Sequence, residues 1–175
     1  MPAILAIINI IKVNMEKRNV DEKSNSFMKR AIDLSLYALE QNHGDPFGSV
    51  IVQNGIIVGE GWNKKQLLTD PSAHAEMEAV RDACRKLKTT SLQGCEVYAS
   101  AQPCPMCLAV LYLSGVENVY YCIPAEGIER LDKNLSVQFI YDALSKQASE
   151  RPIPEIQIQG EEADDLVERY RKLTQ

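Results

Sequence analysis

Basic residues are in the minority in this chain. The sequence has 19 Lys and Arg against 24 Asp and Glu, which gives a formal net charge of −5 at pH 7. Proteins that bind nucleic acid through its phosphates need clustered Lys and Arg, so this balance disfavours a nucleic-acid partner. Long apolar runs are lacking too: residues 2–11 are mostly apolar but are too few to cross a bilayer, which needs about 20. We therefore expect no membrane partner.

The N-terminal stretch also lacks the features of a secretory signal. No basic residues precede residues 2–11, and no clear small-residue cleavage site follows them. Because residues 12–26 are polar and charged, we interpret residues 1–24 as a flexible leader and arm. The change in composition suggests that Met15 is the biological start, which the intact mass of the native protein would test. The other 151 of the 175 residues, 25–175, fit one domain without repeats or a low-complexity linker.

Histidine and cysteine are scarce, with two His and five Cys. Cys84, Cys95 and Cys122 lie in apolar patterns and are expected to be buried free thiols. Such thiols suit the reducing cytoplasm, where we place the protein. The remaining pair stands in Pro103-Cys104-Pro105-Met106-Cys107, at positions i and i+3.

One of the two histidines forms a metal-ligand set with this pair. His74, Cys104 and Cys107 offer one imidazole and two thiolates, the ligand types that zinc prefers. The sequence has no second Cys-x-x-Cys and no His-x-x-x-His to close the site. Three protein ligands leave a fourth position for water, which is the arrangement of a catalytic site. We predict one Zn²⁺ per subunit with a bound water or hydroxide.

Both ligand segments lie at predicted helix starts. Apolar periodicity indicates a helix over residues 73–88 and a second one that begins at the cysteines. The partial positive charge of two helix N-termini favours thiolates beside the ion. Glu76, two residues after His74, is predicted to take a proton from the bound water and return it to a leaving group. The other charged residues of this helix are expected to form its solvated face: Glu78, Arg81, Asp82, Arg85 and Lys86.

Other interpretations of these residues stay open. A lone Cys-x-x-Cys can be a redox pair, and a zinc site with an unrecognised fourth ligand would be structural. His43, in the loop after the first helix, could be a further ligand or a base because its pKa is tunable. A loop histidine is more often only solvated.

The hydrophobic pattern predicts an α/β fold: a three-layer α/β/α sandwich with a central five-stranded mixed sheet. A hairpin at Asn54-Gly55 joins two antiparallel strands, and helix-linked strands later in the chain are parallel. The predicted helices are residues 25–41, 73–88, 136–145 and 161–173, besides the cysteine helix. The predicted strands are residues 50–52, 56–63, 96–100 and 116–122, and an edge strand at residues 153–159.

The His-x-Glu and Pro-Cys-x-x-Cys motifs together are the pattern of zinc-dependent nucleobase deaminases. The chain therefore resembles the cytidine deaminase superfamily. Within it, Asp45-Pro46-Phe47-Gly48, Asp70-Pro71-Ser72-Ala73-His74 and Phe139-Ile140-Tyr141 look most like small bacterial guanine deaminases. The resemblance covers roughly residues 27–171. It implies hydrolytic deamination of a nucleobase or nucleoside, with guanine favoured, by a homodimer in which residues 136–175 are exchanged and help to cover the site.

The resemblance also implies substrate contacts. The family carries a substrate-binding Asn at the position of Asn63 and places the segment with Phe47 near the site. Peptide N–H groups near Ala75 and Cys104 are expected to help hold the base. From the residues alone, Asn63 could instead cap a turn and Phe47 could belong to the core.

At three points the chain departs from guanine deaminases. Gln102 stands where they carry Glu, and Asp132 is the nearest acid to the place of an Asp that contacts guanine. Tyr170 is the nearest candidate for their C-terminal aromatic lid. Adenine derivatives, guanosine, cytosine, pterins and triazines therefore stay open as substrates. So do a tRNA adenosine deaminase, against which the acidic terminal helix argues, and an inactive deaminase-fold binding module, against which the intact motifs argue.

Overall fold

The computed structural model describes residues 22–131, 135–158 and 161–174. The chain divides into two units, Met1–Val137 and Gln138–Gln175. Most of the predicted leader, residues 1–24, lies outside the described residues, and so does Asp132. No helix in the described ranges is long and apolar enough to cross a membrane.

A mixed sheet of four strands forms the centre of the first unit. In the order β2-β1-β3-β4 it contains β2 (Ile56–Trp62), β1 (Gly48–Gln53), β3 (Cys95–Ala101) and β4 (Asn118–Ile123). β1 is antiparallel to β2 and β3, whereas β3 and β4 are parallel. The predicted antiparallel hairpin and the parallel pair linked by a helix are therefore both confirmed.

The turn between β1 and β2 depends on its two residues. Asn54 has φ 51° and Gly55 has φ 72°. A two-residue hairpin turn with both residues at positive φ matches the right-handed twist of the strands, and Asn-Gly is the pair that adopts it most readily. The local sequence alone therefore sets the register at this end of the sheet.

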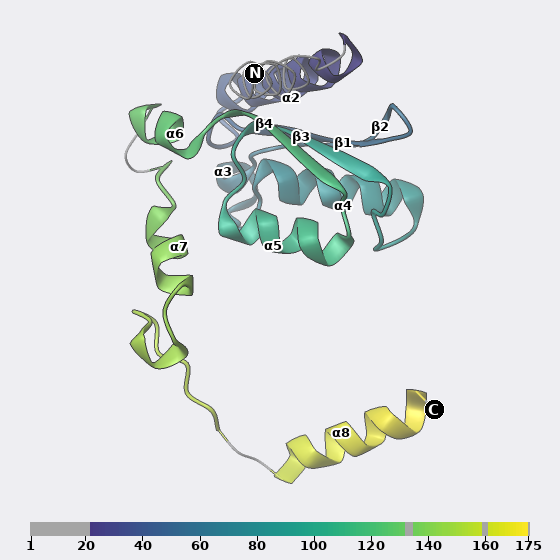
Figure 1. Ribbon diagram of the computed structural model, residues 1–175, viewed down its shortest axis with the longest axis vertical. Coiled ribbons are helices and arrows are strands. Elements are labelled where there is room, and N and C mark those ends of the chain that lie inside the picture. Colours follow the sequence, from purple (N-terminus) through teal and green to yellow (C-terminus); the bar gives the residue numbers. More distant parts are fainter. Residues whose placement is uncertain (1–21, 132–134, 159–160, 175) are drawn as a thin grey trace, which may run out of the picture. The chain divides into compact units, whose positions relative to one another are not determined.

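Helices cover both faces of the sheet. Figure 1 shows α2 (Glu22–Glu40) on one face, and α4 (Ala75–Leu87) with α5 (Pro105–Ser114) on the other. The alternation along the strands supplies both cores. Val50, Val52 and Tyr98 pack with residues of α2, and Ile51 and Val97 pack with residues of α4 and α5. The predicted three-layer sandwich is confirmed.

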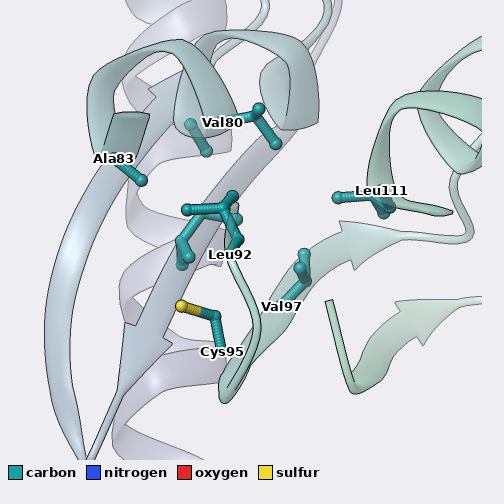
Figure 2. Packing of buried hydrophobic residues seen from close by; sticks show 8 residues of the cluster. Val80, Ala83, Leu92, Cys95, Val97 and Leu111 are labelled. Atoms are coloured by element: carbon teal, nitrogen blue, oxygen red, sulfur yellow. The ribbon is translucent and has the colours of Figure 1, made fainter. Parts of the chain in front are cut away.

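The core on the α4 side brings together segments that are far apart in the sequence. Figure 2 shows its side chains converging from the strands, both helices and the loop before β3. The labelled members are Val80, Ala83, Leu92, Cys95, Val97 and Leu111. Because Val80 and Leu111 share this cluster, α4 and α5 lie against the same layer. Their N-termini carry the predicted ligands.

The number of strands was predicted wrongly. The described residues contain four strands rather than five, and residues 153–158 of the predicted edge strand form no β pairing. Ile153, Ile156 and Ile158 are between 80% and 90% exposed. Alternating apolar residues form a strand only when a neighbouring backbone pairs with them, and the described chain supplies none.

The described residues contain further helices besides α2, α4 and α5. In the first unit, α3 (Lys65–Leu68) follows β2, and α6 (Ala125–Leu131) follows β4. The second unit contains α7 (Gln138–Leu144), the 3-10 helix η2 (Ala148–Glu150) and α8 (Glu161–Thr174), so the predictions at residues 136–145 and 161–173 are confirmed. Six large apolar side chains of its helices are exposed: Phe139, Leu144, Leu166, Val167, Tyr170 and Leu173.

Candidate metal centre

The predicted ligands meet in the structure. Nδ1 of His74 lies 3.6 Å from Sγ of Cys104 and 3.6 Å from Sγ of Cys107. All three ligand atoms lie within 4.8 Å of one another, and no other such group occurs in the parts of the chain that the structure describes. In tetrahedral zinc sites, with Zn–N about 2.0 Å and Zn–S about 2.3 Å, nitrogen and sulfur lie roughly 3.5 Å apart. The cluster therefore fits zinc.

Helix caps position two of the three ligands. His74 is the N-cap of α4 and Cys104 is the N-cap of α5, both with extended backbone, and Cys107 lies in the first turn of α5. Neither cap side chain makes the usual hydrogen bond to its own helix, so the ring and the thiol are available to a cation. Pro105, at the start of α5, has no N–H to satisfy there.

The two thiols shift each other's pKa in opposite directions. The pKa of Cys104 falls to about 4, chiefly because Cys107 donates a hydrogen bond to it, with a further contribution from His74. The pKa of Cys107 is raised for the same reason, since it keeps the proton that it donates. Hydrogen bonding to Cys104 also raises the pKa of His74. A divalent cation that replaces these protons would hold both thiolates.

Glu76 lies beside the ligands and is buried. Its side chain, in the first turn of α4, is 7% exposed. Burial raises the pKa of this carboxyl, because the charged form is poorly solvated there. A carboxyl beside a metal site is placed to accept and release a proton.

Asn63 is buried and only part of its amide is hydrogen-bonded in the described residues. Its side chain is fully buried, its backbone N–H donates to the Phe47 carbonyl at 2.9 Å, and its Oδ1 accepts from the N–H of Lys65 at 3.1 Å. Its Nδ2 has no partner in the described part of the chain. A buried donor without a partner costs about 1–3 kcal/mol, which a ligand that accepts its hydrogen bond would recover. The amide oxygen thus caps a turn, as the alternative prediction held, while the amide nitrogen remains available.

Backbone contacts connect Asn63 with the metal cluster. The N–H of Lys64 donates to the carbonyl of Ala73 at 2.9 Å. Asn63 directly precedes the donor residue and His74 directly follows the acceptor residue, so this hydrogen bond holds the two segments together. β2 packs tightly against α4 because Gly61 has no side chain: a Cβ there would lie 2.2 Å from the carbonyl oxygen of Ala75. Ala75, buried at the start of α4, lies directly beside His74.

His43 and Phe47 have different environments. His43 Nδ1 accepts a hydrogen bond from Nε1 of Trp62 at 3.1 Å, and its ring stacks on Trp62. His43 therefore belongs to an aromatic cluster with Trp62 and Tyr37, apart from the three metal ligands. Phe47 is half-buried and reaches Asn63 through its carbonyl.

The structure corrects two expectations. Glu78 is not on a solvated face: it is 8% exposed and forms ion pairs with Lys64 at 2.8 Å and Arg81 at 2.6 Å. Arg81 stands at i+3 on the same helix, so the sequence could suggest this pair. Lys64, just before α3, is 14 residues away, and no local pattern indicates its contact with Glu78. Cys122 is exposed because β4 is the last strand in the sheet order, whereas Cys84 is half-buried and Cys95 buried.

Gln102 has a role in the fold. Its Oε1 accepts a hydrogen bond from the N–H of Ala125 at 3.1 Å, at the start of α6. Its own N–H donates to the carbonyl of Ile123 at 2.8 Å. Gln102 therefore links the segment before Cys104 to the beginning of α6.

Comparison with known proteins places these motifs in a family context. Residues 21–123 match the cytidine and deoxycytidylate deaminase zinc-binding region. The chain is 40% identical to guanine deaminase of Bacillus subtilis (strain 168) over 133 residues, which cover 76% of this chain and 84% of that protein. An X-ray structure of guanine deaminase from Bacillus subtilis superposes with a TM-score of 0.80 at 36% identity, covering 85% of this chain and 93% of that one.

Two further relatives show how widely the fold is used. The tRNA-specific adenosine deaminase of Aquifex aeolicus (strain VF5) is 42% identical over 95 residues, which span 54% of this chain and 62% of that protein. A structure of NE0047 in complex with 2,6-diaminopurine has a TM-score of 0.58 at 26% identity, covering 61% of this chain and 59% of that one. A protein with a similar fold thus binds a free aminated purine.

Proposed function

Because the chain belongs to the family of deaminases that share the cytidine and deoxycytidylate deaminase zinc-binding region, we propose that it deaminates a purine base hydrolytically, with guanine favoured. The reaction converts guanine and water into xanthine and ammonia. The observation that carries the proposal is the cluster of His74 Nδ1 with Cys104 and Cys107 Sγ, 3.6 Å apart, beside the buried Glu76.

In this proposal His74, Cys104 and Cys107 hold one zinc ion. When bound, zinc acts as a Lewis acid and brings the pKa of a coordinated water down to about 7. The three side chains orient the ion, and the N-termini of α4 and α5 add a positive field to the pocket. The fit of the nitrogen and sulfur positions to a tetrahedral site supports this assignment.

Glu76 is proposed as the proton carrier. Its carboxylate takes the proton from the attacking water and delivers it to the ring nitrogen next to the carbon under attack. It then takes the remaining proton from the added hydroxyl group and transfers it to the amino group, so that the C=O bond forms while the C–N bond breaks and ammonia leaves. The burial that raises its pKa supports this role, because both protonation states are then accessible during one turnover.

Three residues are proposed to hold the base. Nδ2 of Asn63 would donate a hydrogen bond to an acceptor on the purine edge. This buried amide nitrogen, which has no partner in the described residues, would then be paired. The N–H of Ala75, at the start of α4, is among the first helical N–H groups and needs no intrahelical acceptor, so it is available to the base. Phe47 would pack on the ring.

A free base is favoured over tRNA for two reasons. The match to Bacillus subtilis guanine deaminase spans 76% of this chain, whereas the match to the Aquifex aeolicus tRNA enzyme spans 54%. The chain also carries a net charge of −5, which opposes binding to a phosphate backbone.

The working protein is proposed to be a cytoplasmic homodimer that exchanges the C-terminal segment, residues 136–175. The second unit exposes large apolar side chains, Phe139, Leu166 and Tyr170 among them, and such faces are normally buried against a partner surface. We further propose that the deaminase domain includes residues 22–24 besides residues 25–175, because these three residues belong to α2 and the family match covers them. The free state of all five cysteines agrees with a reducing compartment.

An ammonia-release assay over free bases, nucleosides and tRNA, with and without a chelator, tests the function. Release from guanine that the chelator abolishes would support it, and release from tRNA alone would favour the second candidate. The Glu76→Gln variant should keep one zinc per chain and lose about 10²–10⁴-fold in kcat. Glu126→Gln, an exposed carboxylate on α6, is the matched control and should keep normal activity. Ordinary turnover by Glu76→Gln would contradict the assigned proton carrier.

A further inference from the structure

Glu76 and Glu78 are the two buried carboxylates in the described parts of the chain, and the proposed chemistry does not use Glu78. Glu78 accepts hydrogen bonds on both oxygens: Oε2 from Lys64 Nζ at 2.8 Å and Oε1 from Arg81 at 2.6 Å. Burial of a carboxylate costs free energy because the charge loses its hydration, unless cations pair with it. Removal of one member of such a pair destabilises the protein, because the other charge stays buried without a partner. The two partners come from different segments, so this carboxylate connects them to α4.

One arm of the network leads to the candidate base-binding residue. Lys64 directly follows Asn63, and its backbone N–H donates to the carbonyl of Ala73 at 2.9 Å. Its Nζ binds Glu78 and also lies 4.2 Å from the ring centroid of Trp62. Lys64 is therefore held at its backbone and at the end of its side chain, which restrains the turn that carries Asn63.

The other arm leads to the metal ligand. Arg81 donates to Oγ of Ser72 at 3.3 Å, and Ser72 in turn donates to Asp70 from its hydroxyl at 2.7 Å and from its N–H at 2.8 Å. The carbonyl of Ser72 accepts the N–H of His74 at 2.8 Å. Glu78 thus reaches, through Arg81, the turn that ends at His74.

We propose that Glu78 is a positioning residue that holds the Asn63 turn in a fixed place relative to His74 and the first turn of α4. This inference rests on the proposed function, because it assigns Asn63 to the base and His74 to the metal. The two arms end next to these two groups, so one carboxylate sets the separation between the base contact and the ion. The charges of the network, Lys64 and Arg81 against Glu78 and Asp70, balance within it.

The Glu78→Gln variant separates positioning from a general effect on stability. Gln keeps the size of the side chain but removes the charge that draws Lys64 and Arg81 inward. KM for guanine should rise roughly tenfold, because the turn with Asn63 is no longer restrained. We expect kcat to stay within about threefold, since Glu76 is held by the first turn of α4. The zinc content should stay at one per chain.

Two further variants make the experiment specific. Asp82→Asn is the control, because it removes another carboxylate of α4. Asp82 accepts a hydrogen bond from the N–H of Glu60 and pairs with the side chain of Lys86, but it contacts neither the Asn63 turn nor the turn before His74. This variant should leave KM unchanged. In the double variant Lys64→Gln with Glu78→Gln, KM should rise no further than in Glu78→Gln alone, because both changes break the same contact. A melting temperature that falls while KM stays at its wild-type value in Glu78→Gln would overturn the proposal.

A measurement without turnover distinguishes this inference from the proposed function. Hydrogen exchange of the zinc-loaded protein reports on the amides of Lys64 and His74, which donate to Ala73 and Ser72. Glu78→Gln should speed their exchange by about tenfold, and Asp82→Asn should not. If wild-type protein releases no ammonia from any base, the function fails while this prediction still stands. Unchanged exchange in Glu78→Gln would refute the positioning role alone.

Discussion

The two units of the chain differ in how far they bury their apolar side chains. In the first unit, helices on both faces of the sheet bury strand residues such as Val50 and Ile51 completely. In the second, α7 and α8 expose Phe139, Leu166 and Tyr170. An apolar helix face is stable in water only when another surface covers it. The first unit therefore has an apolar core of its own, although Tyr112 and Leu113 are exposed there, whereas the named side chains of the second unit are left uncovered.

Replacement of a metal ligand in the first unit should have the largest effect on zinc content and activity. In Cys107→Ser the set of one imidazole and two thiolates is broken, so zinc content should fall and activity should drop by more than about a thousandfold. Atomic absorption and the ammonia assay measure both. Cys122→Ser, which replaces an exposed thiol in the same unit, should change neither. Full zinc content in Cys107→Ser would show that the cluster is not the metal site.

Substitutions on α8 test the dependence of the second unit on a partner. Leu166→Asp combined with Tyr170→Asp places charges on its exposed apolar face. The proposed dimer should dissociate, as measured by light scattering, because burying each charge costs several kcal/mol. Glu168→Gln on the same helix should leave the dimer intact, since Glu168 makes only an exposed pair with Arg171. A stable dimer in the charged variant would mean that α8 does not form the interface.

Within the first unit, Gly44 tests how tightly Asn63 is packed. A Cβ at this position would lie 2.1 Å from Oδ1 of Asn63, so Gly44→Ala must displace the amide. KM for the base should rise roughly tenfold, with a smaller change in kcat. In an Asn63→Ala background the same substitution should add little, because the displaced group is already missing. Additive effects in the two backgrounds would show that Gly44 acts elsewhere.

The smallest effect should appear in the acid stability of the first unit. Burial raises the pKa of Glu78, but the hydrogen bonds from Lys64 and Arg81 outweigh it, so the pKa lies below its ordinary value of 4.5. A carboxyl with a depressed pKa stabilises the fold above its unfolded pKa, and this stabilisation is lost as the pH falls through the folded value. Urea unfolding between about pH 3 and pH 7 should show a shallower acid loss in Glu78→Gln than in the wild type. Identical pH profiles would contradict the ion pairs.

Local patterns were sufficient for most elements. Asn54-Gly55 placed the hairpin, and the 3.6-residue period placed α2 and α4 to within a few residues. α2 includes residues 22–24, which precede the predicted helix at residues 25–41, because charged residues can extend a helix beyond its apolar stripe. The strand at residues 153–159 was predicted from alternation alone, which cannot show whether a partner strand exists.

The amino-acid sequence by itself determined the ligand types, their spacing and the helix starts that carry them, because i, i+3 spacing and caps are local properties of the backbone. Only the tertiary structure decided that Nδ1 of His74 meets both sulfurs, that the buried amide nitrogen of Asn63 has no partner in the described residues, and that Glu78 turns inward to Lys64. Each of these facts joins segments that are distant in sequence. Burial and pairing between such segments depend on how the sheet brings them together, and no local pattern records that.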